Sequence, residues 1–209
     1  VKLNPAHKPS VVIEGLCDAN MIRCEKKNTE NKDIRKCMYA GLLDVRYGVK
    51  MMVDGFILAD LLNVELHIYG DGPYAEELTK ITEKHPNVVY HGTVMNDVVI
   101  QAELDADLLI NPRPTHEEFT KYSFPSKNME YMATGTPVLT TNLPGMPEEY
   151  KQYVYLMEDE TEQGVCKVLL SVFSEAESMR FEKGLRAKRF VLKQKNNAKQ
   201  AERLLGILK

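Results

Sequence analysis

The chain has no tryptophan, and only 8% of its 209 residues are aromatic. No apolar run approaches the roughly 20 residues that a membrane-spanning helix needs, so we expect no such helix. The start, Val1–Lys8, has no signal-peptide pattern. No Cys-x-x-Cys or other metal-ligand spacing occurs, and no cluster of carboxylates and histidines predicts a bound metal. We therefore interpret the four cysteines as free thiols in a reducing cytosol; they are Cys17, Cys24, Cys37 and Cys166.

The charge is unevenly distributed along the chain. Arg180–Lys209 holds ten Lys or Arg residues and two Glu, a local charge of +8, whereas the whole chain carries −3. The remainder therefore carries −11, which argues against a nucleic-acid-binding protein. The basic segment has two open interpretations, a solvated helical surface or contact with anionic lipid.

Short apolar runs alternate with helical patterns through most of the sequence, which at 44% hydrophobic and 27% charged residues is ordinary for a globular protein. Apolar runs of about four to six residues, in which apolar and polar side chains do not alternate, are typical of strands covered on both faces. Strands are expected at Cys37–Ala40, Glu65–Tyr69, Val88–His91, Leu108–Ile110, Val138–Thr140 and Tyr153–Leu156, with a further short one at Val11–Ile13. Helices are expected near Gly48–Leu62, Tyr74–Lys84, Asp97–Leu104, Ser126–Ala133, Glu162–Phe173, Glu177–Lys193 and Asn196–Leu208. This order predicts an α/β fold with a doubly wound, Rossmann-like parallel sheet of about six strands and extra C-terminal helices, preceded by a polar loop at Cys24–Lys36.

In such a sheet, ligands bind beyond the carboxyl ends of the strands. Glycine follows three successive predicted strands, at Gly41, Gly70 and Gly92, and lets a ligand approach the backbone closely. The alternative is that each glycine only turns the chain. Arg113 follows the next strand and is a candidate cation for the same rim.

The segment Tyr122–Thr141 predicts a tight loop, a short helix and a buried strand. Ser123 is a plausible helix cap, Pro125 suits a first helical turn and Gly135 suits the position just past the end. The start of a helix carries unpaired N–H groups and a partial positive charge, which favours a phosphate. The positive charge of Lys127 in the first turn is unfavourable beside the positive end of the helix dipole. Its position therefore indicates a bound anion that neutralises the ammonium and the helix start together.

Two other motifs are better explained by structure than by chemistry. Gly70–Ala75 fits the dinucleotide fingerprint G-x-G-x-x-A, but the next strand ends in His91-Gly92 instead of the acidic residue that holds a ribose. Asp105-Ala106-Asp107 has the form of a metal-binding Asp-x-Asp, yet its first residue ends a helix and its last opens a strand. His116 on the rim is interpreted as a solvated loop residue.

Phe124-Pro125-Ser126-Lys127, followed by Met129–Leu139, resembles the nucleotide-sugar-binding segment of family 4 retaining glycosyltransferases. In those proteins the second domain of a GT-B fold carries this segment. Tyr39–Val49 resembles the family's first strand and loop, and Gly70–Pro73 its next strand-to-helix turn. The resemblance implies that residues 35–209 form the donor-binding domain and residues 1–34 a leading segment or linker, with an acceptor-binding N-terminal domain absent.

By this resemblance, Glu130 accepts hydrogen bonds from the ribose hydroxyls and Thr93 and Val94 read the base, while the diphosphate lies at Ser126 and Lys127. Lys127 and Glu130 are the expected catalytic residues. The residues expected to contact the donor are Gly41, Arg46, Gly70, Gly92, Thr93, Val94, Arg113, Tyr122, Ser123, Phe124, Pro125 and Ser126.

The chain departs from the family pattern at three positions. Leu42 and Tyr47 stand where the family carries its phosphate-binding Arg and Lys, and Tyr122 replaces the first Glu of a pair separated by seven residues. The missing Glu leaves open how the hexose is held. Lys127 is the expected replacement for the lost cations, with Arg46 and Arg113 as weaker candidates.

The resemblance implies transfer of a hexose from a UDP- or GDP-linked sugar to a glycan or lipid-linked acceptor, in surface polysaccharide biosynthesis, without a separate cofactor. The implied location is cytoplasmic, peripheral to the inner membrane, and the isolated domain is expected to bind nucleotide without transferring sugar. Two alternatives remain: half of a nucleotide-sugar epimerase, which needs no acceptor, and a non-catalytic assembly module, which binds no nucleotide.

Overall fold

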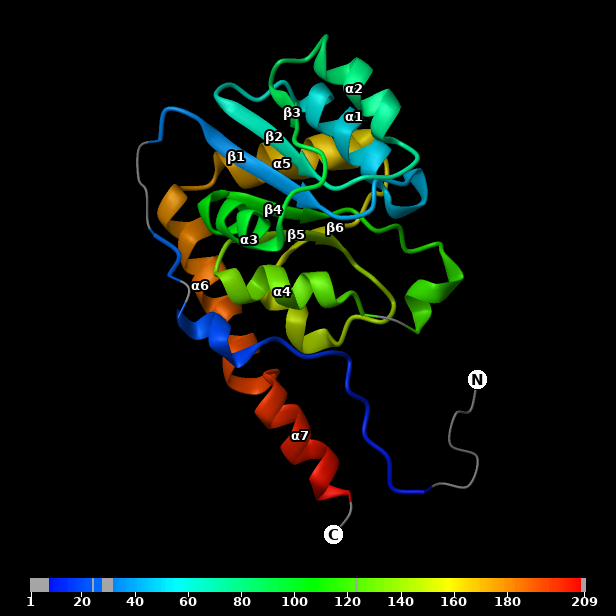
Figure 1. Ribbon diagram of the computed structural model, residues 1–209, viewed down its shortest axis with the longest axis vertical. Coiled ribbons are helices and arrows are strands. Elements are labelled where there is room, and N and C mark those ends of the chain that lie inside the picture. Colours follow the sequence, from blue (N-terminus) through cyan, green and yellow to red (C-terminus); the bar gives the residue numbers. More distant parts are fainter. Residues whose placement is uncertain (1–7, 24, 28–31, 123, 208–209) are drawn as a thin grey trace.

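The computed structural model describes residues 8–23, 25–27, 32–122 and 124–207. Its centre is a six-stranded parallel sheet, as the sequence predicts, and the strand order is β3-β2-β1-β4-β5-β6 (Figure 1). The strands are β1 (Arg35–Ala40), β2 (Val64–Tyr69), β3 (Val88–Tyr90), β4 (Leu108–Asn111), β5 (Val138–Thr141) and β6 (Tyr155–Met157). The strand order reverses between β1 and β4, and this switch point is where ligands bind in sheets of this class.

Helices cover both faces of the sheet, because right-handed crossovers in opposite directions place them on opposite sides (Figure 1). One face carries α1 (Val49–Ala59), α2 (Ala75–Thr82) and α5 (Glu162–Ser174). The other face carries α3 (Asn96–Asp105), α4 (Ser126–Thr134) and α6 (Glu177–Gln194), and α7 (Asn197–Gly206) extends beyond it. Short 3-10 helices occur at Ala19–Arg23, Val45–Tyr47, Glu118–Lys121 and Glu148–Tyr153.

The two faces of β1 contribute to separate hydrophobic cores. Cys37 and Tyr39 face the core beneath α1, α2 and α5, whereas Met38 and Ala40 face the core beneath α4 and α6. All four side chains are buried. β1 is therefore a central strand covered on both faces, as its uninterrupted apolar run predicts.

The expectation that the strand is covered on both faces is wrong for β2. Glu65 and His67 are only half-buried, whereas Val64, Leu66 and Ile68 are buried, so the strand alternates. The physical reason is the path of α3, which connects the edge strand β3 to β4 and packs beside β1. Among the described residues, no helix consequently covers this part of β2 on that face.

The strand predicted at Val11–Ile13 is absent from the described structure. This leading segment instead packs against the C-terminal helices, with an isolated backbone bridge between Cys17 and Asn196. Between α6 and α7 the buried Lys195 forms an ion pair with Glu14. Backbone and ion-pair contacts of this kind hold the segment without a strand partner.

Two predicted boundaries also move. The last strand was expected at Tyr153–Leu156, but Tyr153 ends a 3-10 helix and the strand begins at Tyr155. The predicted loop at Cys24–Lys36 lies partly outside the described residues, and its end, Arg35 and Lys36, belongs to β1. Among the described helices, none combines the length and the apolarity that crossing a membrane requires.

The close packing of α6 on the end of α4 yields a stability prediction. A Cβ atom at Gly184 would lie 2.1 Å from the carbonyl oxygen of Gly135, so Gly184→Ala forces backbone apart. We expect the free energy of unfolding to fall by about 1–3 kcal/mol in urea titrations. Gly206→Ala in α7 is the matched control, because no described atom lies within 4 Å of its Cβ position. Equal unfolding midpoints for the two variants would contradict this packing.

Candidate functional site

The start of α4 lies at the carboxyl edge of the sheet, where the sequence places the anion site. Pro125 occupies the cap position in an extended conformation (φ −62°, ψ 124°), one residue earlier than the predicted first turn. Among the described residues no side chain caps this helix start, and the predicted cap Ser123 lies outside them. The helix ends at Gly135 in the left-handed region (φ 86°), as predicted. The first-turn N–H groups carry the partial positive charge that attracts an anion.

Buried side chains fix the position of α4 relative to the strands. Asn111 at the end of β4 donates to the Asn128 side chain over 2.7 Å, and the Asn128 amide lies 3.3 Å from the Thr140 hydroxyl on β5. The Tyr131 hydroxyl accepts the Ala40 N–H at 2.9 Å and donates to its carbonyl at 3.3 Å. Because burial raises the pKa of Tyr131 well above its ordinary value, the hydroxyl keeps its proton. α4 is thereby tied to β1, β4 and β5.

Lys127 and Glu130, the two residues predicted to carry catalysis, lie in one cavity. This cavity of about 400 Å³ lies between α3, α4 and residues 16–21. Lys127 is half-buried, with Nζ 5.3 Å from the centroid of the Tyr131 ring, whereas Glu130 is exposed. Asn96, at the start of α3, lines the same cavity. The structure therefore brings together the two predicted residues and the region after β3.

Glu103 in the same cavity is a residue that sequence reasoning missed. Its side chain is buried on α3. Burial raises the pKa of Glu103 to about 7; Lys127 opposes this shift and Glu130 adds to it. Lys127 therefore lies in the field of two acidic groups, one of which titrates near neutral pH.

The three rim glycines differ in what surrounds them. A Cβ at Gly70 (φ +122°) would lie 1.9 Å from the Gly41 carbonyl oxygen, so this glycine permits one loop to pack on another. A Cβ at Gly41 would lie 2.8 Å from the Tyr39 hydroxyl. At Gly92 (φ +66°), no described atom lies within 4 Å of that position. Of the three, Gly92 leaves open space on its Cβ side, and the half-buried Val94 and exposed Thr93 follow it.

The predicted arginines are held differently. Arg46 binds its neighbour Asp44 through Nε at 3.1 Å and a terminal nitrogen at 2.6 Å, and these hydrogen bonds hold the pKa of Asp44 below its usual range. The Arg113 guanidinium lies over the Tyr47 ring, 4.9 Å from its centroid. The two cations thus have different partners, a carboxylate for Arg46 and an aromatic face for Arg113.

The remaining predicted residues surround the helix start. Ser126 and Tyr122 are exposed, Tyr122 to 65%. Phe124 is half-buried and packs on Tyr150, with ring centroids 4.7 Å apart. Phe124 therefore anchors the loop to the protein interior, and Tyr122 and Ser126 remain accessible from solvent.

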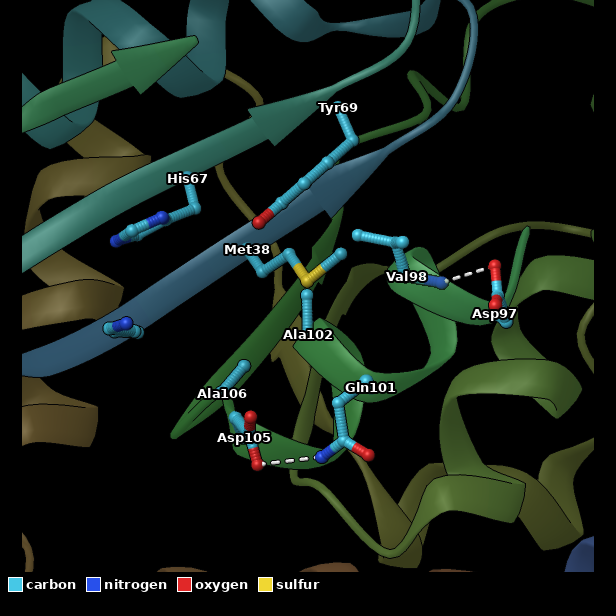
Figure 2. A pocket seen from close by; sticks show the side chains of 10 residues that line it. Met38, His67, Tyr69, Asp97, Val98, Gln101, Ala102, Asp105 and Ala106 are labelled. Carbon is cyan, nitrogen blue, oxygen red and sulfur yellow. Dashed lines mark hydrogen bonds between the residues drawn. The ribbon is translucent and has the colours of Figure 1, made fainter. Parts of the chain in front are cut away.

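A second cavity lies away from the predicted site. It measures about 590 Å³ and lies between β1, β2 and α3, lined by Met38, His67, Tyr69, Asp97, Gln101 and Asp105 among others (Figure 2). No predicted ligand residue lines it. His67 Nδ1 and His91 Nε2 are 2.9 Å apart, and the His91 ring stacks on Tyr69. The sequence feature that could have indicated this cavity is that Glu65, His67 and Tyr69, at every second position of β2, carry polar groups.

The Asp105-Ala106-Asp107 motif and His116, both interpreted from the sequence as structural, have partners in the fold. The Asp107 carboxylate accepts the Lys36 N–H at 2.7 Å and pairs with Lys32 at 2.9 Å. His116 is exposed, 3.8 Å from the Glu160 carboxylate. Within the described part of the chain, no group of three His, Cys, Asp or Glu side chains is arranged to hold a metal ion.

A family model described as "Glycosyl transferases group 1" matches residues 34–174. No protein of curated function matches the chain. Three solved structures are similar at a level that shows the fold. Sucrose-phosphate synthase from Thermosynechococcus elongatus has a TM-score of 0.70 and 15% identity, covering 94% of this chain and 53% of that one. Anabaena HepE, solved with UDP and glucose, has a TM-score of 0.70 and 17% identity, covering 92% and 55%.

The third is the C-terminal domain of LpcC from Francisella tularensis, a glycosyl transferase group 1 family protein. Its TM-score is 0.66 with 14% identity, and the match covers 87% of this chain and 99% of that domain. The chain thus spans about half the length of the first two proteins and corresponds in extent to the isolated domain of the third.

Glu103 gives the site a testable pH dependence. Its folded-state pKa of about 7 lies above the ordinary 4.5, so between these values the folded chain binds more protons than the unfolded chain. Stability attributable to this group therefore falls as pH rises from 4.5 to 7. We expect Glu103→Gln to unfold in urea with a free energy about 1–3 kcal/mol higher than the parent at pH 8 and equal to it below pH 4.5. The exposed Glu83→Gln is the control, and parallel pH profiles for Glu103→Gln and the parent would contradict the assignment.

Proposed function

The chain belongs to the glycosyl transferases group 1 family, and from this premise we propose that it is the donor-binding domain of a retaining, family 4 type glycosyltransferase. The donor is a nucleoside diphosphate hexose, with UDP favoured because the structurally similar HepE was solved with UDP and glucose. The observation that carries the proposal is the start of α4, anchored by buried side chains at the switch point, with Lys127 and Glu130 in one cavity.

The donor binds along the carboxyl edge of the sheet. Its diphosphate lies at the N–H groups of Ser126 and Lys127, where the helix start and the ammonium both favour an anion. Glu130, one turn along, accepts hydrogen bonds from the ribose hydroxyls. The base lies beside Gly92–Val94, where the backbone of Gly92 leaves open space.

Catalysis depends on positioning and on stabilising the charge that develops on the leaving diphosphate. The bond from the anomeric carbon to the diphosphate oxygen breaks, and the acceptor hydroxyl forms a bond to that carbon on the same face. The proton of the acceptor hydroxyl passes to the departing diphosphate. Lys127 and the helix start supply the positive potential.

The acceptor is held by a second domain, since this chain covers 53% of the sucrose-phosphate synthase and 55% of the HepE structures that it resembles. In this proposal residues 1–34 link to that domain and residues 35–209 bind the donor. The acceptor is a glycan or lipid-linked sugar of surface polysaccharide biosynthesis. The basic surface of α6 and α7 then contacts the anionic cytoplasmic face of the membrane.

Nucleotide affinity tests the site directly. We expect Lys127→Ala and Glu130→Gln each to weaken UDP binding by roughly ten- to hundredfold, because each removes one charged contact. Calorimetry with UDP, GDP and ADP measures the effect and identifies the base. Lys167→Ala and Glu83→Gln, exposed residues on α5 and at the end of α2, are matched controls. Unchanged affinity in both test variants would exclude this site.

Product analysis with UDP-glucose tests whether this chain binds the donor while a second domain is needed to bind the acceptor. We expect the chain alone to bind the donor and to release neither a glycosylated acceptor nor an epimerised sugar nucleotide, because the acceptor side of the site is missing. Chromatography of the reaction separates the outcomes. An epimerised product without acceptor would establish the epimerase alternative, and transfer by the chain alone would refute the need for a second domain.

A further inference from the structure

We propose that Glu103 is a specificity-determining residue that contacts one hydroxyl of the donor's ribose, next to the hydroxyl held by Glu130. This inference rests on the proposed function and adds a second carboxyl to the part of the site that holds the nucleoside. Its basis is the cavity of about 400 Å³ between α3, α4 and residues 16–21, which Glu103 and Glu130 both line.

The carboxyl of Glu103 has no polar partner in the part of the chain that the structure describes. The residue is 5% exposed, and no described group donates a hydrogen bond to its side chain. Its backbone is fixed, because the Thr136 hydroxyl donates to the Glu103 carbonyl oxygen at 2.7 Å. A buried carboxyl without a hydrogen bond is unfavourable, and a ligand hydroxyl in the cavity would supply the missing partner.

The charges that line the cavity are arranged for a ligand with an anionic end and a hydroxyl-bearing end. Lys127 lies in the first turn of α4, where the helix start also favours an anion. Glu130 follows one turn along, and the charges of both residues act on the Glu103 carboxyl. Carboxyl groups bind hydroxyls and disfavour phosphates, so this end of the cavity suits the sugar of a nucleotide.

Two carboxyls match the two neighbouring hydroxyls of a ribose. Glu130 is exposed and Glu103 is buried, so the two groups meet a ligand at different depths of one cavity. Each ribose hydroxyl can donate one hydrogen bond, and each carboxyl can accept it. The proposed contact therefore distinguishes a ribose from a deoxyribose.

The protonation state of Glu103 sets the strength of its contact. Burial raises the pKa of this carboxyl to about 7, with Lys127 opposing the shift and Glu130 adding to it. The Tyr131 hydroxyl interacts electrostatically with Glu103, and Asp18 lines the same cavity from the leading segment. A hydroxyl binds a carboxylate more strongly than a neutral acid, so the preference for ribose should increase as pH rises through about 7.

The test measures by calorimetry the affinities for UDP and GDP and for their counterparts that lack one or the other ribose hydroxyl. For one of the two hydroxyls, we expect its removal to weaken binding roughly three- to tenfold at pH 6 and roughly ten- to hundredfold at pH 8. Glu103→Gln should show the smaller loss at both pH values, because its amide stays neutral. Glu103→Leu should bind the ribose nucleotide and that deoxyribose nucleotide equally.

The ratio of the two affinities separates a sugar contact from a merely structural role. Phosphate ionisation cancels in this ratio, because both nucleotides carry the same diphosphate. A ratio in Glu103→Leu equal to that of the parent and of the exposed control Glu83→Leu would overturn the inference, even if both affinities fell. If Glu103→Leu does not unfold cooperatively in urea, Glu103→Gln decides, and a ratio that still rises with pH in that variant would refute the contact.

Lys127→Ala and Glu130→Gln distinguish the failure of this inference from the failure of the proposed function. If these two variants weaken nucleotide binding while Glu103→Leu keeps the parent's ratio, the inference fails and the proposed function stands. If the parent binds neither UDP nor GDP, both fail together.

Discussion

The hydrogen bonds of the Tyr131 hydroxyl with the backbone of Ala40 tie α4 to the end of the central strand β1, and the position of Lys127 and Glu130 depends on this contact. Ala40 ends β1, where β4 no longer pairs with it, so its N–H and carbonyl groups would otherwise face a gap in the sheet. A buried backbone group without a partner costs about 1–3 kcal/mol. One hydroxyl satisfies both groups and in doing so fixes α4 over the switch point. The divergence of β1 from β4 and the position of α4 over the switch point are therefore linked through one side chain.

Much of the fold follows from the sequence because the alternation of short apolar runs and helical patterns is a local signal. The errors arise where burial depends on distant segments. Glu65 and His67 lie half-buried because α3 crosses beside β1, and Val11–Ile13 finds its contacts on the C-terminal helices. Nothing within either segment encodes those neighbours. Tyr153 ends a 3-10 helix although it belongs to a short apolar run whose residue types favour a strand. Such a run takes its conformation partly from the contacts that the rest of the fold provides.

In the candidate site, too, the residues predicted from the sequence are those with a local signal, and the residues missed depend on contacts between distant segments. Lys127 and Glu130 share one short helix, so their spacing alone predicts a common location, and the structure places both in one cavity. Glu103 was missed because a glutamate on a helix gives no sequence signal of whether it is exposed or buried. The pairing of Tyr47 with Arg113 was missed because it requires two loops, separated by three strands in the sequence, to meet across the switch point.

The three cations predicted to contact the donor are held in three different ways. Arg46 is bound by a carboxylate, Lys127 shares a cavity with Glu103 and Glu130, and Arg113 lies on an aromatic ring. An anion that approached Arg46 would have to compete with the Asp44 carboxylate for its guanidinium. The stacking of Arg113 on Tyr47 joins the loop after β1 to the loop after β4, on the two sides of the switch point. The same edge of the sheet is thus held by an aromatic contact between loops and by the buried hydrogen bonds of Tyr131 to Ala40.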